Sequence, residues 1–188
     1  MTNAIANLRD IVPIRPLTIT ESLRIAELQA GRLRTLTAVT DSAFPETVIS
    51  ELPRVQVDRM FPAPSSGASQ WSRGRWLILL NGADPPGRQR FSLAHEFKHV
   101  LDNPFVEVLY PPWRGQTAEA RREAICDYFA ACLLMPRADL KKIWFGGTQE
   151  VRTLAHRFEV SLQAMQVRLT QLGLVEPPSR HHPKGVHS

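Results

Sequence analysis

The chain has 188 residues, and its 23 basic and 18 acidic side chains give a formal net charge of +5 with histidine neutral. This length suits one domain with a sizeable core, and an apolar content of 43% excludes an intrinsically disordered chain. The longest apolar runs are too short to span a bilayer, and the first ten residues lack the pattern of a secretory signal. We therefore expect a cytoplasmic protein with no membrane partner.

The first part of the sequence predicts two helices after a short lead-in. Residues 1–17 contain two prolines and are expected to be extended. Thr18 and Glu21 have the spacing of a capping box, and the apolar residues that follow recur at helical intervals. A second, short helix is expected between Pro45 and Pro53.

Two strands are predicted in the middle of the chain. Residues 55–57 and 76–80 both alternate between apolar and other side chains, which is typical of half-buried strands. The segment between them, residues 62–72, is rich in serine, glycine and proline and is expected to be a loop. We expect the two strands to pair in a small antiparallel sheet.

The rest of the chain is predicted to be helical, with breaks at proline and glycine. The expected helices cover residues 88–101, 117–135, 148–158 and 161–172, and a short helix that contains Leu140, Ile143 and Trp144 is expected to end at Gly146-Gly147. The only two cysteines, Cys126 and Cys132, would lie on nearly opposite faces of one of these helices, so they cannot form a disulfide with each other. Their number excludes a disulfide-stabilised scaffold and favours a reducing compartment.

The sequence His95-Glu96-Phe97-Lys98-His99 is the sharpest chemical signal in the chain. Residues four apart on a helix lie one turn apart on one face, so His95 and His99 can both bind one metal ion. Glu96 is rotated away from this row and can reach a water molecule held by the metal, as a general base does. The alternative is a solvated helix face with two incidental histidines.

A catalytic zinc ion needs a third protein ligand. Of the downstream carboxylates, Glu123 is the best candidate because Asp127 follows it by one helical turn. Asp127 could then accept a hydrogen bond from the outer nitrogen of a ligand histidine and fix its orientation. The alternative is that both are ordinary acidic residues near the start of a helix, where the helix dipole favours negative charge.

These motifs resemble the ImmA/IrrE family of zinc-dependent endopeptidases. The resemblance rests on RQRFSLAHEFKHVLDNP and, 24 residues after His99, on EAICDYFAACLLMP. It implies a zincin-like fold in which His95, His99 and Glu123 bind Zn²⁺, Glu96 is the catalytic base and Asp127 orients a ligand. The resemblance also leaves open the alternative that the site binds another divalent ion, such as Mn²⁺.

Two positions depart from the family pattern. Phe97-Lys98 replaces the usual Leu-Gly, and a lysine there adds bulk and charge that could narrow the cleft. Cys126 replaces an alanine. We interpret it as a packed small residue whose helix angle points it away from the Glu123 row, and not as a fourth ligand.

The C-terminal stretch has the apolar spacing of a helix-turn-helix. Its polar residues could face DNA: Arg157, Gln163, Gln166 and Arg168. The competing interpretation, which we favour because the two helices carry few basic residues, is a helical pair packed on the catalytic core. We therefore expect weak DNA binding or none.

These inferences together predict an α+β, zincin-like metallopeptidase with a small antiparallel sheet packed by helices. We expect a lead-in over residues 1–17, a peptidase domain over 18–146, a packed helical pair over 147–175 and a flexible tail over 176–188. The resemblance implies a protein substrate, a helix-turn-helix repressor or an antitoxin, in a phage, mobile-element, stress-response or toxin–antitoxin setting. The alternatives are a DNA-binding regulator with a structural metal and a catalytically silent member that docks a partner.

Overall fold

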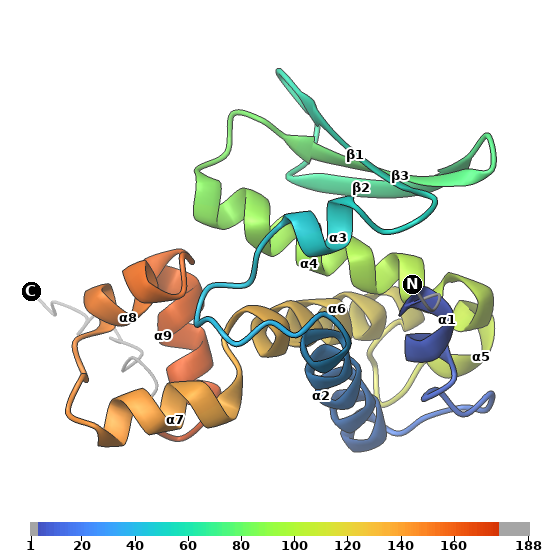
Figure 1. Cartoon of the computed structure of the whole chain (residues 1–188). Helices are drawn as coiled ribbons and strands as arrows, with labels where there is room; N and C mark the ends of the chain where they lie inside the picture. Colours follow the sequence, from blue (N-terminus) through green and yellow to red (C-terminus); the bar gives the residue numbers. More distant parts are fainter. Residues whose placement is uncertain (1–3, 177–188) are drawn as a thin grey trace, which may run out of the picture.

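A computed structural model describes residues 4–176, and its fold is α+β, the class predicted from the sequence. Figure 1 shows a small sheet at one side of a stack of helices. The strands are β1 (Val55–Met60), β2 (Gly67–Ser72) and β3 (Arg75–Asn81). The longer helices are α2 (Ile19–Leu36), α4 (Pro86–Asp102), α6 (Ala118–Leu134), α7 (Arg137–Phe145) and α9 (Leu162–Gln171). The shorter ones are α1 (Ala4–Arg9), α3 (Thr47–Ser50), the 3-10 turn η1 (Asn103–Phe105), α5 (Val106–Leu109) and α8 (Val151–Arg157).

The sheet has the order β1-β3-β2 and is mixed, which corrects the predicted antiparallel pairing. The two predicted strands do pair, but β1 runs parallel to β3, with Val55 opposite Trp76. The antiparallel partner of β3 is β2, which lies in the segment expected to be a loop. Arg73 and Gly74 connect these two strands with φ angles of 50° and 77°. Two positive φ angles in a two-residue connection define the turn that matches the twist of a hairpin.

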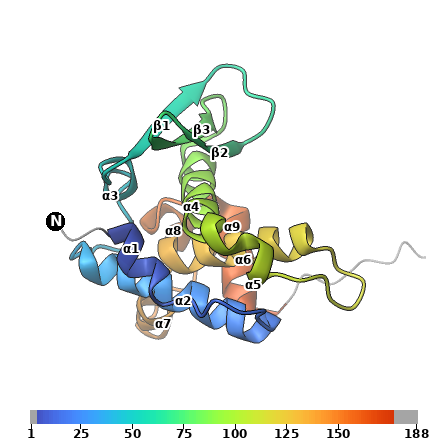
Figure 2. The same ribbon diagram turned by 90° about the vertical axis from the view of Figure 1, so that its right-hand side faces the viewer.

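Helices α4, α6 and α2 form successive layers behind the sheet, as Figures 1 and 2 show. Strand β3 turns alternate side chains, Trp76, Ile78 and Leu80, into the core. Helix α4 packs beneath β2 and β3, α6 packs on α4, and α2 packs on α6. Both α4 and α6 are therefore buried along much of their length, which fixes the side chains that they direct at each other.

The N-terminal segment differs from the expected extended lead-in because residues 4–9 form α1. Its Ile5 and Leu8 are buried, so packing against the neighbouring helices overrides the signal of the prolines further along. The predicted start of the next helix is confirmed. The Thr18 side chain accepts a hydrogen bond from the Glu21 backbone, and the Glu21 carboxylate accepts one from the Thr18 backbone.

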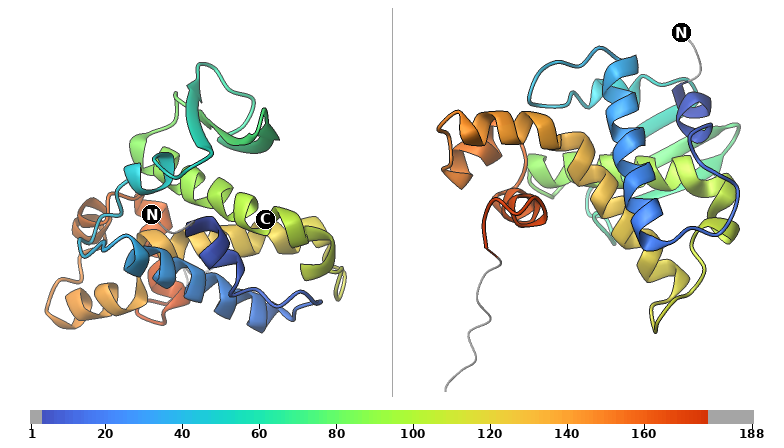
Figure 3. Two further views of the ribbon diagram at one scale, coloured as in Figure 1. Left: turned by 45° about the vertical axis from the view of Figure 1, so that its right-hand side comes forward. Right: turned by 90° about the horizontal axis from the view of Figure 1, so that it is seen from below.

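Helices α7, α8 and α9 gather at the C-terminal end of α6 (Figure 3). Leu154, Met165 and Leu169 from the last two helices, and Phe158 directly after α8, are buried in the common core. The predicted tail lies outside the described residues except for Glu176. Among residues 4–176, no helix has both the length and the apolar composition needed to cross a membrane.

Candidate metal centre and active site

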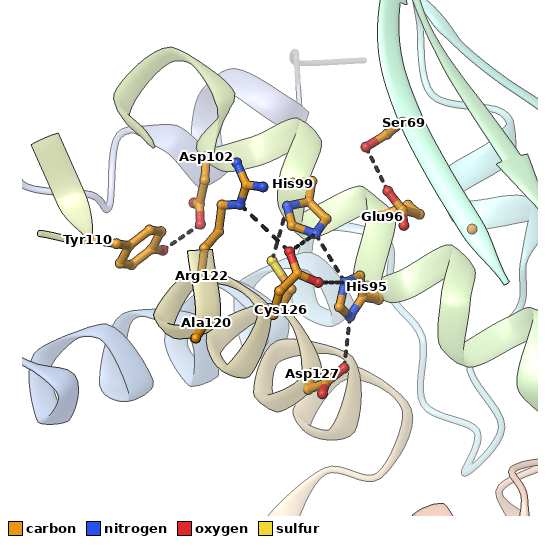
Figure 4. A network of polar contacts seen from close by, with 12 residues as sticks. Ser69, His95, Glu96, His99, Asp102, Tyr110, Ala120, Arg122, Cys126 and Asp127 are labelled. Atoms are coloured by element: carbon orange, nitrogen blue, oxygen red, sulfur yellow. Dashed lines mark hydrogen bonds and ion pairs between the residues drawn. The ribbon is translucent and has the colours of Figure 1, made fainter. Parts of the chain in front are cut away.

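Helix α4 directs His95 and His99 toward the same point, as their spacing predicts. The Nε2 atoms of the two rings are 3.0 Å apart, and the ring centroids are 4.8 Å apart. Prolines at positions 85 and 86 start this helix, and its buried face fixes the direction of both imidazoles. Figure 4 shows the rings facing the beginning of α6.

Glu123 on α6 completes a triangle of donor atoms. Its Oε2 lies 3.2 Å from His95 Nε2 and its Oε1 lies 3.3 Å from His99 Nε2. Ligands at about 2.0–2.1 Å from a tetrahedral zinc ion are separated from one another by roughly 3.3 Å. The nitrogen and carboxylate donors therefore fit a zinc ion in both type and spacing.

Asp127 lies behind His95, on the side away from this triangle. Its Oδ1 is 2.8 Å from His95 Nδ1. If Nδ1 donates this hydrogen bond, Nε2 carries the lone pair that a metal ligand needs. Burial opposes protonation of His95, but Asp127, Glu96 and Glu123 outweigh burial and raise its pKa. The surroundings of His95 thus favour positive charge at this point.

Cys126 lies closer to the histidines than its predicted orientation allows. It is buried, as expected for a packed small residue, but its Sγ is 3.6 Å from His99 Nδ1. The expectation that its helix angle points it away is wrong, because a residue three positions after Glu123 lies on nearly the same helix face. His95, His99 and Cys126 form a second group that could hold a metal ion.

The thiol is the weaker candidate for the third ligand. It contacts the outer nitrogen of His99, whereas Glu123 faces the inner nitrogens of both rings. Burial raises the pKa of Cys126 well above its usual value, and a metal ligand must be a thiolate. His99 itself has a pKa of about 4, lowered by burial and by the charge of His95.

Glu96 lies beside the triangle and is held by the edge strand β2. Its Oε2 accepts a hydrogen bond of 2.8 Å from Ser69 Oγ. A Cβ atom at Gly67 would lie 2.9 Å from Glu96 Cγ, so only glycine allows this close contact. Burial raises the pKa of Glu96, although the Ser69 hydrogen bond acts in the opposite direction.

A cavity of about 200 Å³ opens next to Glu96 and His99. Trp76 and Val106 contribute apolar surface to it, and Arg122 contributes a guanidinium group. The Arg122 Nε is buried without a hydrogen-bond partner among the described residues and lies 3.7 Å from Glu123 Oε1. The sequence motifs did not single out Arg122, although its position next to Glu123 was a usable signal.

Lys98 does not narrow this cavity, in contrast to what the sequence suggested. Its side chain is 1% exposed, and Nζ donates to Gln29 Oε1 on α2 at 2.8 Å and to Asp102 Oδ1 on its own helix at 2.6 Å. Tyr110 donates to the other oxygen of Asp102. Lys98 therefore belongs to a buried polar network, in which Asp102 lines the cavity and Lys98 itself does not.

The C-terminal helices present fewer DNA-facing candidates than the sequence suggested. Arg168 is 1% exposed and donates to the Met135 carbonyl oxygen, so it cannot contact DNA. Arg157 donates to Ser42 Oγ at 3.2 Å. Both contacts join the helical pair to the rest of the molecule.

The family model described as the IrrE N-terminal-like domain, peptidase M78, matches residues 54–170, which is more than half of the chain. The chain belongs to this family. The matched region contains all five predicted site residues, and the resemblance to ImmA/IrrE proteins is confirmed.

Two similar proteins are each named radiation response metalloprotease IrrE. That of Deinococcus radiodurans is 29% identical over 170 residues, covering 85% of this M78 chain and 51% of the relative. That of Deinococcus deserti is 37% identical over 91 residues, covering 45% of this chain and 32% of the relative. The solved structure of a Mycobacterium tuberculosis transcriptional regulator has a TM-score of 0.64 at 17% identity, covering 89% of this chain and 51% of that one. At this identity the likeness concerns the fold alone, and the chain spans about half or less of each relative's length.

Proposed function

We propose that this chain is a zinc-dependent endopeptidase. The observation that carries the proposal is the convergence of His95, His99 and Glu123 donor atoms within 3.0–3.3 Å of one another, beside the carboxylate of Glu96. Zinc bound there would supply a Lewis acid that polarises a peptide carbonyl and lowers the pKa of a coordinated water toward about 7. Imidazole and carboxylate donors would also accept another divalent ion such as Mn²⁺.

Glu96 would act as the general base in hydrolysis. Since Ser69 binds Oε2, Oε1 is left to take a proton from the attacking water. The resulting hydroxide forms a bond to the carbonyl carbon, the carbon–nitrogen bond breaks, and Glu96 returns its proton to the leaving amine. Burial favours the protonated form of Glu96 and so makes this carboxylate a better proton acceptor than an exposed one.

Strand β2 offers a way to bind an extended peptide. It is an edge strand of the described sheet, and Gly67 and Ser69 within it contact Glu96. A substrate segment could add to this edge through backbone hydrogen bonds. The cavity lined by Trp76 and Val106 would then take one substrate side chain. A flexible or extended segment fits such a site, and a packed helix does not.

We further propose that the substrate is a helix-turn-helix repressor or an antitoxin, and that cleavage relieves repression. The support for this class of substrate is the family resemblance. The competing function is a DNA-binding regulator with a structural metal; the Mycobacterium tuberculosis protein of similar fold is named a transcriptional regulator. The burial of Arg168 opposes it.

The test uses the purified chain, its measured metal content and the repressor encoded by a neighbouring gene. We expect about one zinc per chain, and one discrete pair of cleavage products. His95→Ala or Glu123→Ala should lose the metal, whereas Glu96→Gln should keep it and lose cleavage. Cleavage by Glu96→Gln at the original rate would contradict the general-base assignment. A tight, sequence-specific DNA complex that survives metal removal, without cleavage of any partner, would favour the regulator.

A further inference from the structure

A second cavity, of about 420 Å³, lies between α2, the C-terminal end of α6, α7 and α9. It is separate from the cavity beside Glu96, with no lining residue in common. Four of its lining residues are basic and one is acidic: Arg34, Arg137, Lys141, Arg168 and Glu27. These charges come from three different helices, so the fold and not a local sequence run brings them together.

Arg168 is the buried member of this group. Its side chain is 1% exposed, Nε donates to the Met135 carbonyl oxygen and Nη1 donates to Gln171. Nη2 has no hydrogen-bond partner within the part of the chain that the structure describes. A buried charge without an ion pair is unfavourable, so a guanidinium donor left over at a cavity indicates a missing acceptor.

Tyr128 and Cys132 are polar side chains that interact with Arg168, and neither neutralises its charge. Its guanidinium lies 5.5 Å from the Tyr128 ring centroid, and Cys132 lines the same cavity. Burial raises the pKa of Tyr128 and of Cys132, and Arg168 offsets burial only in part. Both groups are therefore neutral near pH 7.

The start of α7 adds a further preference for negative charge. Pro136, the N-cap of this nine-residue helix, lines the cavity together with Arg137 and Ala138 of its first turn. No side chain caps that turn. Unpaired backbone N–H groups and the positive end of the helix dipole both attract anions.

Two acidic groups reduce the positive charge of the cavity but do not cancel it. Glu27 lines the cavity, and Asp139 lies 3.7 Å from Arg34. Arg34 is also held by the carbonyl oxygens of Leu133 and Asp41, so its charge is largely committed to the protein. Arg137, Lys141 and Arg168 remain as the groups able to bind a ligand.

We propose that this cavity binds the phosphate group of a small ligand. A planar guanidinium, a flexible ammonium and a helix N-terminus are the donors that phosphate sites use. The volume lies within the range of about 300–1,000 Å³ that is typical of small-molecule sites, and so exceeds what inorganic phosphate needs. Free phosphate and a nucleotide would both be recognised through the phosphate group. Their relative affinities show which of the two the cavity binds.

The cavity lies on the helix that carries Glu123, but at its other end. Cys132 is nine residues beyond Glu123, which corresponds to roughly 13 Å along the helix axis. A ligand there would join α2, α7 and α9 around the end of α6. The proposal does not depend on peptidase activity, and its test does not measure cleavage.

The test is isothermal titration of the full, metal-loaded chain with inorganic phosphate, pyrophosphate and adenosine monophosphate at constant ionic strength. Lys141→Gln and Arg137→Gln should each weaken binding about tenfold, the loss expected for one charge-assisted hydrogen bond. Lys142→Gln is the matched control, because this exposed neighbour on the same helix does not line the cavity, and it should change affinity less than twofold. Arg168 is not the decisive variant, because its loss also removes the bond to Met135 and could prevent folding.

Three outcomes would overturn the proposal. The first is no saturable binding of any of the three ligands. The second is equal sensitivity to Lys141→Gln and Lys142→Gln, which would mean general surface attraction. The third is binding that disappears on metal removal and ignores Lys141→Gln, which would place phosphate at the metal. If the chain binds duplex DNA through Lys141 but binds no small phosphate, the cavity is a DNA contact and not a small-molecule site.

Discussion

Replacing Lys98 with methionine should strongly destabilise the fold while leaving the donor triangle in place. Lys98 and Asp102 are both 1% exposed, and their charged atoms are 2.6 Å apart. Removing one partner from a buried ion pair costs about 3–5 kcal/mol, because the remaining charge stays buried and unpaired. Methionine preserves most of the apolar stem, so the effect reports the lost charge and not a cavity. A loss of this size is a large part of a typical total stability of about 5–15 kcal/mol.

The assay is urea unfolding of the metal-free protein, so that metal binding does not contribute to the measured stability. The matched variant is Asp102→Asn, which removes the negative charge and keeps an acceptor for Tyr110. The double variant should be more stable than the sum of the two losses predicts, by about 2–3 kcal/mol. If Lys98 narrowed the cleft instead, Lys98→Met would improve peptide binding and leave stability unchanged. A loss below about 1 kcal/mol, or strictly additive variants, would refute the buried-pair argument.

Two further predictions concern the candidate site. Asp127→Ala should weaken zinc affinity about 10–100-fold, measured by competition with a chelator, because it removes the hydrogen bond to His95. Glu119→Ala, one helical turn before Glu123, should leave that affinity unchanged, and equal losses would show that the helix face is misassigned. Gly67→Ala should lower the turnover number about tenfold or more at constant metal content, because the new methyl group displaces Glu96. Gly31→Ala has no neighbour within 4 Å of its new Cβ and is the control; an equal loss there would exclude a specific effect at Gly67.

The helical part of the fold follows from local sequence signals. Thr18 and Thr117 act as N-caps in the structure, and the sequence predicts both at the beginning of a helix. The arrangement of His95, Glu96 and His99 also follows from helix geometry alone, since four residues make about one turn. Local signals of this kind do not depend on what the helix packs against.

The sheet and the residues that it contributes to the site could not be predicted in the same way. Alternation identifies a strand but not the direction of its partner, so it does not reveal the parallel pairing of β1 with β3. Strand β2 is polar and contains glycine, and it is a strand because β3 pairs with it. Ser69 reaches Glu96 only through this tertiary contact, across 27 residues of sequence.

Two side chains on the central helices show a different limit. Proximity to the ligands in the sequence suggests that Lys98 affects the cleft, but its partner Gln29 is 69 residues away. The predicted side of the helix is wrong for Cys126, although a three-residue spacing from Glu123 is enough to place it correctly. The position of Lys98 could be corrected only once the fold was known. That of Cys126 could have been corrected from the geometry of a single helix.

The contacts at the end of α6 have a consequence for fragments of this protein. A helix leaves its last carbonyl oxygens without internal partners. Here Arg34 from α2 donates to the Leu133 carbonyl oxygen, and Arg168 from α9 donates to that of Met135. Two cations from distant parts of the sequence therefore cap the negative end of the helix that presents Glu123. A fragment that stops after α7 keeps every predicted ligand and Arg34 but loses the bond from Arg168 to Met135, so the far end of the Glu123 helix should fray more readily.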